Sequence, residues 1–94
     1  MRPSRNSDLI DALAVEIKAR RIELGYTQED LAGHCDLDRP YISLIEVGRK
    51  QPSLSVLFRI AIGLQFTLEE LSARIERRYK HSTRAQARTA RGSP

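Results

Sequence analysis

Residues 27–46, TQEDLAGHCDLDRPYISLIE, are interrupted so often that they can form only short helices. Thr27 supplies a side-chain oxygen that can cap a first helix, and Asp36 breaks that helix nine residues later. Pro40 suits only the first turn of a second helix, because proline has no N–H to donate further along. Gly48 then ends the second helix. The segment therefore predicts two short helices joined by a tight turn.

Three further helices are predicted by caps and by apolar residues at helical spacing. The first runs over residues 8–24 after Asn6 or Ser7, the fourth over 54–64 after Ser53, and the fifth starts at residue 68. Gly63 is expected to weaken the last turn of the fourth helix. The expected core residues of the five helices are Ile10, Leu13, Ala14, Ile17, Leu24, Leu31, Ala32, Cys35, Ile42, Ile45, Leu54, Leu57, Phe58, Ile60, Ala61, Ile62, Leu64, Phe66, Leu71 and Ile75. With no strand pattern, the predicted class is all-α, five helices around one aliphatic core.

Composition excludes several functional classes. The chain has 94 residues, which suits one domain, and its apolar runs are far shorter than the ~20 residues of a membrane span. The polar start MRPSRNSD lacks the apolar stretch of a signal peptide, so a cytoplasmic protein is expected. Cys35 has no second cysteine to pair with, and no Cys/His cluster has metal spacing. We also find no nucleophile–base pair and no phosphate loop, so neither an enzyme nor a cofactor is expected.

The positive charge is concentrated at the C-terminus. Residues 74–94 contain seven basic residues and one acid, a net charge of +6, whereas the whole chain carries +4. Residues 1–73 therefore sum to −2. Any attraction of the globular part for phosphate must come from local groups of charge rather than from the total.

The chain divides into an N-terminal arm (1–7), a helical domain (8–79) and a basic C-terminal tail or extension (80–94). The tail has two interpretations. The small polar residues of STRAQARTARGSP indicate disorder. Basic residues spaced three or four apart instead indicate one face of a helix, namely Arg77, Lys80, Arg84, Arg88 and Arg91.

The layout of residues 27–46 is that of a helix-turn-helix, in which one helix braces another that enters the DNA major groove. Residues 24–71 resemble the lambda-repressor-like (Cro/cI, XRE-class) family, and in particular the small controller proteins of restriction–modification systems. The likeness rests on residues 37–43, LDRPYIS, and on the pattern Ile45-Glu46-x-Gly48. Further matches in the same register are Gln28, Leu31, Ala32, Pro52 and Ser53.

The resemblance implies two structural details. Position 36, usually glycine in this family because the turn often needs a positive φ, is Asp here, one of the better alternatives. Arg21 of the first helix is expected to form a partly buried salt bridge with Glu46 at the end of the third.

The residues expected to bind DNA fall into two groups. Base edges are expected to be read by Arg39, Pro40, Ser43 and Leu44, with Arg39 foremost because a guanidinium can bridge guanine O6 and N7. Phosphate contacts are expected from residues that flank the groove, namely Thr27, Gln28, Tyr41, Arg49, Lys50 and Gln51.

The predicted function is a sequence-specific, double-stranded DNA-binding transcription regulator. The surplus of apolar residues in the fourth and fifth helices indicates a homodimer that binds a near-palindromic operator. Two alternatives stay open. One is an antitoxin-type autoregulator whose C-terminal tail binds a protein partner. The other is an interaction module that has kept the fold and lost DNA binding.

Overall fold

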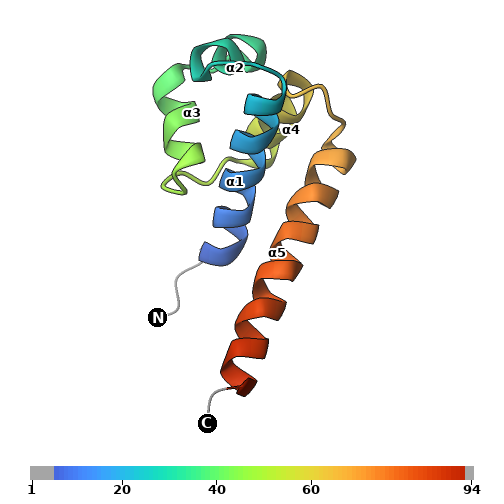
Figure 1. Ribbon diagram of the computed structural model, residues 1–94. Helices are drawn as coiled ribbons and strands as arrows, with labels where there is room; N and C mark the ends of the chain where they lie inside the picture. Colours follow the sequence, from blue (N-terminus) through green and yellow to red (C-terminus); the bar gives the residue numbers. More distant parts are fainter. Residues whose placement is uncertain (1–5, 93–94) are drawn as a thin grey trace.

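The computed structural model describes the backbone of residues 6–92 and the side chains of residues 6–82. This part of the chain contains five α-helices and no strand: α1 (Ser7–Glu23), α2 (Gln28–Cys35), α3 (Arg39–Glu46), α4 (Leu54–Gly63) and α5 (Leu68–Gly92). The predicted all-α, five-helix class is confirmed. Figure 1 shows α3 and α5 on opposite sides of α1, with α2 at the top of the view.

Side-chain caps determine where the helices begin. Asn6 accepts a hydrogen bond from the backbone N–H of Leu9 at the start of α1, and Ser53 accepts one from Val56 at the start of α4. Reciprocal capping boxes open α2 and α5, as the T-x-x-D and T-x-x-E patterns predict. Each cap satisfies backbone N–H groups that have no partner within their helix.

Asp36 forms the tight turn between α2 and α3. Its backbone is left-handed, with φ 55° and ψ 48°, and the N–H of Leu37 returns to the carbonyl of Ala32 at 2.9 Å. This is the helix ending for which glycine is usual, and an aspartate can adopt it at modest cost. The positive φ implied by the resemblance is therefore present at Asp36.

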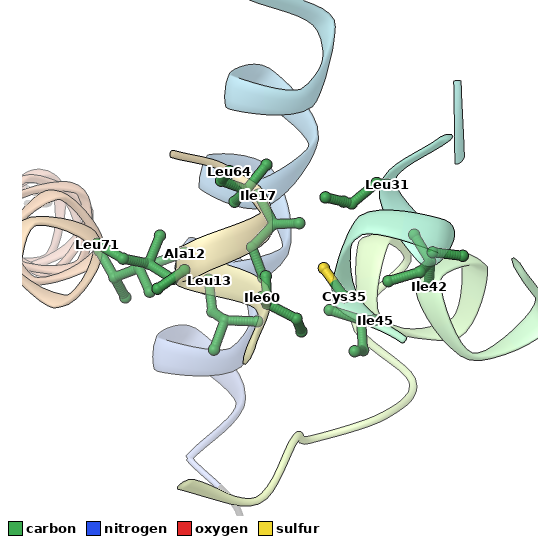
Figure 2. Close-up of a cluster of buried hydrophobic side chains, with 13 residues drawn as sticks. Ala12, Leu13, Ile17, Leu31, Cys35, Ile42, Ile45, Ile60, Leu64 and Leu71 are labelled. Carbon is green, nitrogen blue, oxygen red and sulfur yellow. The ribbon is translucent and has the colours of Figure 1, made fainter. Parts of the chain in front are cut away.

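The core lies where α1 and α4 meet the other three helices (Figure 2). Its largest fully buried side chains are aliphatic: Ile17, Leu31, Ile42, Ile45, Ile60, Leu64 and Leu71. Burying a side chain of this size stabilises a fold by about 1.5–3 kcal/mol. Because these residues come from all five helices, packing at this one centre sets the position of α3 relative to the rest of the domain.

The structure corrects two expectations about α4. Leu54, Phe58 and Ile62 lie outside the core, with 72%, 50% and 60% of their surfaces exposed. Gly63 is buried against α2, where an added Cβ would lie 2.5 Å from Cys35 Sγ. Instead of merely weakening the last turn, this glycine permits two helices to cross at close range.

The C-terminal helix α5 is 25 residues long and extends well beyond the other helices (Figure 1). It passes residue 80, where the tail was expected to start, without a break in the helix. Its backbone to Gly92 follows the helical interpretation of the tail, whereas the side chains of Arg84, Arg88 and Arg91 lie outside the described part.

Ionic contacts help to hold α5 against α1. The carboxylate of Glu16, buried on α1, lies 3.3 Å from Arg74 Nε and 2.8 Å from Arg78 Nη2. Leu71 and Ile75 add apolar packing nearer the start of α5. The first half of α5 is thereby part of the domain. None of the described helices combines the length and apolar character needed to cross a membrane.

Candidate nucleic-acid interface

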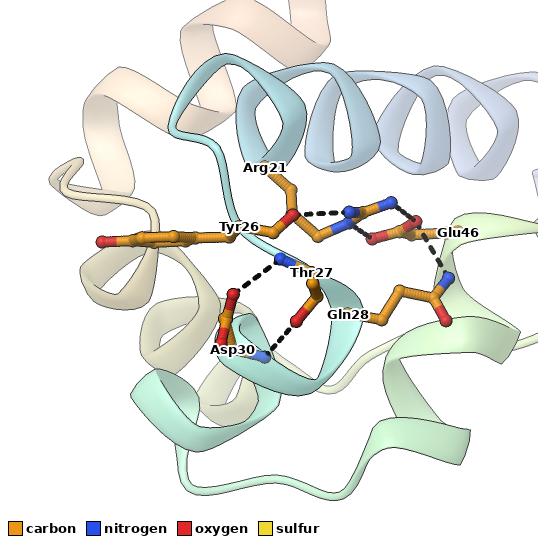
Figure 3. A network of polar contacts seen from close by, with 6 residues as sticks. All are labelled: Arg21, Tyr26, Thr27, Gln28, Asp30 and Glu46. Carbon is orange, nitrogen blue, oxygen red and sulfur yellow. Dashed lines mark hydrogen bonds and ion pairs between the residues drawn. The ribbon is translucent and has the colours of Figure 1, made fainter.

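Arg21 and Glu46 form the ion pair that the resemblance implies (Figure 3). Arg21 Nε lies 2.7 Å from Glu46 Oε2, and Nη2 lies 3.0 Å from Oε1. Arg21 Nη1 also donates to the carbonyl of Tyr26 at 2.7 Å. Only 11% of the Arg21 side chain and 2% of the Glu46 side chain are exposed. The C-terminal end of α3 is thus fastened to α1 by a two-point, largely desolvated contact.

Gln28, expected to contact phosphate, takes part in the same network. Its Nε2 donates to Glu46 Oε1 at 3.2 Å, so the side chain points toward α3 (Figure 3). This contact does not use the backbone N–H of Gln28, at the start of α2, or its second amide hydrogen. The side chain therefore has a structural task that the sequence pattern did not reveal.

Thr27 and Asp30 close the N-terminal end of α2. Asp30 N–H donates to Thr27 Oγ1 at 3.0 Å, and Thr27 N–H donates to Asp30 Oδ2 at 2.9 Å. Hydrogen bonding from Thr27, by its backbone N–H first and its side chain second, lowers the pKa of the Asp30 carboxyl.

The outer face of α3 carries all four residues expected to read bases. Arg39, Pro40 and Leu44 are exposed and Ser43 is half-buried, whereas Ile42 and Ile45 on the opposite face are buried. Helical geometry explains the division, because positions 39, 40, 43 and 44 lie on one side of the helix. None of the four residues expected to read bases therefore belongs to the buried core.

The loop after α3 folds back toward that helix. The N–H groups of Arg49 and Lys50 both donate to the carbonyl of Leu44, at 3.0 and 3.2 Å. Lys50 Nζ then lies 5.4 Å from the centre of the Tyr41 ring, a cation–π distance. The structure thus brings together Tyr41 and Lys50, and it leaves Arg49 and Gln51 exposed beside them.

Two contributors to this site were missed from the sequence. Asp38 caps α3 by accepting a hydrogen bond from the backbone N–H of Tyr41 at 3.1 Å. An aspartate two residues before a first-turn proline is a sequence signal for such an N-cap, and it could have identified Asp38. Arg59 of α4 donates to the carbonyl of Cys35 at the end of α2. No sequence signal marks this second contact, because a backbone carbonyl is present at every position.

Cys35 is the last residue of α2 and is buried. Burial raises the pKa of its thiol to about 11, with Arg59 opposing that shift. A thiol that stays protonated at neutral pH is a weak nucleophile and a weak metal ligand. Within residues 6–92, no group of three or more acidic, histidine or cysteine side chains could hold a metal ion.

Residues 17–71 match the helix-turn-helix family, and this span contains α2, α3, α4 and the Arg21–Glu46 pair. The chain belongs to the XRE-type helix-turn-helix family. The control protein C.MunI of Mycoplasma is 43% identical over 60 residues, which is 64% of this chain and 81% of that protein. A hypothetical transcription factor of Neisseria meningitidis is 34% identical over 76 residues, which is 81% of this chain and 72% of that protein.

Solved structures of the same family have the same fold. The restriction–modification controller protein C.Esp1396I, solved as a tetramer with its natural 35 base-pair operator, superposes with a TM-score of 0.74 and 34% identity. That match covers 79% of this chain and 97% of the controller. The clp gene regulator ClgR of Corynebacterium glutamicum gives a TM-score of 0.78 at 25% identity, over 95% of this chain and 92% of that one. These relatives are transcription regulators, so the fold belongs to a DNA-binding regulatory family rather than to an enzyme family.

Proposed function

We propose that this protein is a sequence-specific regulator of transcription that binds double-stranded DNA through α3 and, its ligand being DNA, acts in the cytoplasm. The observation that carries the proposal is the orientation of α3. Its inner face is fixed by Ile42, Ile45 and the Arg21–Glu46 pair, and its outer face presents Arg39 and Leu44 to solvent. A rigidly held helix with an exposed guanidinium is what reading a major groove requires. Residues 1–73 carry net negative charge, so placement matters more than bulk attraction.

In this proposal one set of residues reads the bases and another set anchors the protein to DNA phosphates. Arg39, Pro40, Ser43 and Leu44 face the base edges, with Arg39 contributing the bidentate contact to guanine. Phosphates on either side of the groove are held by groups at the start of α2, in α3 and in the loop after α3: Thr27, Gln28, Tyr41, Arg49, Lys50 and Gln51. The anchors set the register of the protein on the duplex, and the α3 face sets the sequence.

Selection of bound sequences from a random DNA pool tests the proposal. The wild-type protein is expected to enrich one near-palindromic site. Arg39→Ala should cost about 1–3 kcal/mol at one base pair of each half-site and relax the preference there. Arg49→Ala is the matched control, because loss of a phosphate contact weakens binding to all sequences alike and lowers the salt dependence. No enrichment by the wild type, or an unchanged preference in Arg39→Ala, would contradict the proposal.

We also infer that the regulator acts as a homodimer through α4 and α5. Leu54, Phe58 and Ile62 form an exposed apolar stripe at four-residue intervals on α4. Beside α4 is an apolar groove of about 360 Å³ between α1, α4 and α5, and its lining includes Leu9, Leu13, Leu57, Ile75 and Tyr79. Such surfaces on a small domain are typical of an interface. A two-fold dimer would place two α3 helices about 34 Å apart, one turn of DNA.

Sedimentation of matched variants tests the dimer. Phe58→Ser is expected to shift the protein toward monomer and to weaken binding to a two-half-site operator far more than to a single half-site. Ile22→Ser is the control, because Ile22 is similarly exposed but lies on α1. Only monomer for the wild type at micromolar concentrations, with no pairing on DNA, would exclude this arrangement.

The length of α5 supports a second function, that of an antitoxin-type autoregulator. The helix continues to Gly92, beyond the residues that pack on α1. In this second proposal a protein partner binds along these last turns. Co-expression with the product of the neighbouring gene distinguishes the two functions. A complex lost on truncation after residue 82, with DNA binding retained, would favour the antitoxin.

A further inference from the structure

Arg59 of α4 contacts the turn between the two helices of the motif. Its Nε donates to the carbonyl of Cys35 at 3.0 Å, and its Nη2 donates to the carbonyl of Asp36. Nη2 also lies 3.6 Å from the Asp36 carboxylate. One side chain on a neighbouring helix thus holds two successive carbonyls at the point where the chain turns toward α3.

These carbonyls are ones that the turn itself leaves open. The earlier carbonyls of α2 are bonded within the chain, since Ala32 accepts from Leu37 N–H at 2.9 Å and Gly33 accepts from Asp36 N–H at 3.4 Å. The last carbonyls of a helix have no intrahelical partner and carry its partial negative charge. A guanidinium at this place therefore satisfies two acceptors and complements the helix dipole.

The residues that Arg59 contacts lie close in sequence to Arg39, the residue expected above all to read bases. Asp36 is followed by Leu37, packed on the core, and by Asp38, the N-cap of α3, so little freedom remains before Arg39. The Arg21–Glu46 pair fastens the far end of the same helix. Two arginines, from α4 and from α1, thus hold the turn before α3 and the C-terminal end of α3.

We propose that Arg59 is a positioning residue for DNA recognition, acting through the backbone of the α2–α3 turn to set where Arg39 stands in the groove. This inference rests on the proposed function. Arg59 itself does not need to touch DNA. Its loss should release the N-terminal end of α3 while the phosphate anchors at the start of α2 and after α3 stay in place.

The test compares Arg59→Ala and Arg59→Lys with the wild type. Affinity is measured for the selected operator and for an unrelated duplex, over a range of salt concentrations. Arg59→Ala is expected to lose about tenfold in operator affinity, the scale of one impaired base contact, with unrelated-duplex affinity and salt slope unchanged. Arg59→Lys should restore part of the loss, because an ammonium reaches one of the two carbonyls. Arg77→Ala, which removes an exposed arginine on α5, is the charge-matched control.

Other outcomes overturn the proposal. An equal loss on both duplexes with a salt slope smaller by about one would make Arg59 a phosphate contact. An unchanged ratio of the two affinities, with only a lower Tm, would make it a general stabilising residue.

Amide hydrogen exchange gives a readout that is independent of DNA. Arg59→Ala should speed exchange at Leu37 and Tyr41, at the N-terminal end of α3, and leave Val47 unchanged. Arg59→Lys carries the same measurement if the alanine variant fails to fold. Unchanged exchange at Leu37 and Tyr41 would refute the positioning role, whereas a wild type without operator preference would refute only the proposed function.

Discussion

Replacing Arg21 by methionine is the most direct test of how α3 is held. Methionine retains much of the volume of the side chain but removes its charge and all its donors. Two hydrogen bonds to Glu46 and one to the carbonyl of Tyr26 disappear. Glu46, with 2% of its side chain exposed, is left as a buried carboxylate that accepts a hydrogen bond from the Gln28 amide at 3.2 Å.

The cost follows from that uncompensated charge. Removing one member of a buried ion pair typically costs about 3–5 kcal/mol, because the other charge stays desolvated. A domain of this size has a total stability of only about 5–15 kcal/mol. Since 1 kcal/mol corresponds to about 4–8 °C in a small domain, the Tm of Arg21→Met should fall by at least about 12 °C.

A double-mutant cycle separates the pair from its surroundings. Urea unfolding of Arg21→Met, Glu46→Gln and the double variant gives the coupling free energy between the two side chains. Glu46→Gln should cost less than Arg21→Met. The Arg21 side chain is more exposed than that of Glu46, at 11% against 2%, and in Glu46→Gln it keeps the Tyr26 carbonyl and an amide oxygen as acceptors. The double variant should be more stable than the sum of the two losses by at least about 1.5 kcal/mol. Additive losses, or a cost below about 1 kcal/mol for Arg21→Met, would refute the reasoning.

Three further predictions concern Gly63, Cys35 and the capping box of α5. Gly63→Ala should destabilise the fold by about 1–3 kcal/mol, since the new Cβ would lie 2.5 Å from Cys35 Sγ. Adding Cys35→Ala should recover part of that loss. A Gly63→Ala protein more stable than the wild type would contradict the close approach of α2 and α4 at this glycine. The Cys35 thiol, with its pKa raised to about 11 by burial, should resist iodoacetamide at pH 8 until the protein unfolds. Its contribution to stability is complete below pH 9 and is lost as the pH rises toward 11, a limb that Cys35→Ala should remove. The pKa of Glu70 is lowered by hydrogen bonds from Thr67, the backbone N–H first, so its contribution is present above its ordinary value of 4.5 and is lost as the pH falls through the folded value. Acid unfolding of Glu70→Gln should therefore depend less on pH than that of the wild type.

The order of the elements was readable from the sequence because their ends are marked locally. Thr27, Ser53 and Thr67 are caps whose chemistry acts within four residues, and the helices begin directly after them. Arg21 and Glu46, 25 positions apart, could be paired only through the resemblance to a known family. Spacing alone would have left both as ordinary charged residues.

Contacts made through space, without a periodic signal, could not be read in this way. Apolar spacing placed Leu54 and Phe58 in the core, and Ile62 was added to that set. However, α4 has more apolar side chains than its buried face can hold, so all three remain outside the core. The close approach at Gly63 depends on how α2 crosses α4, which no local pattern encodes. Glu16 looks like a solvated residue of α1 until α5 brings Arg78 against it.

The contacts that hold both ends of α3 have a consequence for redesign. Arg21 and Arg59 act on Glu46 and on backbone carbonyls, so neither depends on the side chains of the outer face of α3. Residues 39, 43 and 44 can therefore be varied together in a library while the scaffold that presents them stays the same. A shorter graft of residues 27–46 alone would lack both arginines. The smallest unit that could be transferred with α3 held in place thus includes parts of α1 and α4. New operator specificities should be sought by substituting residues on the outer face of α3 within the whole domain.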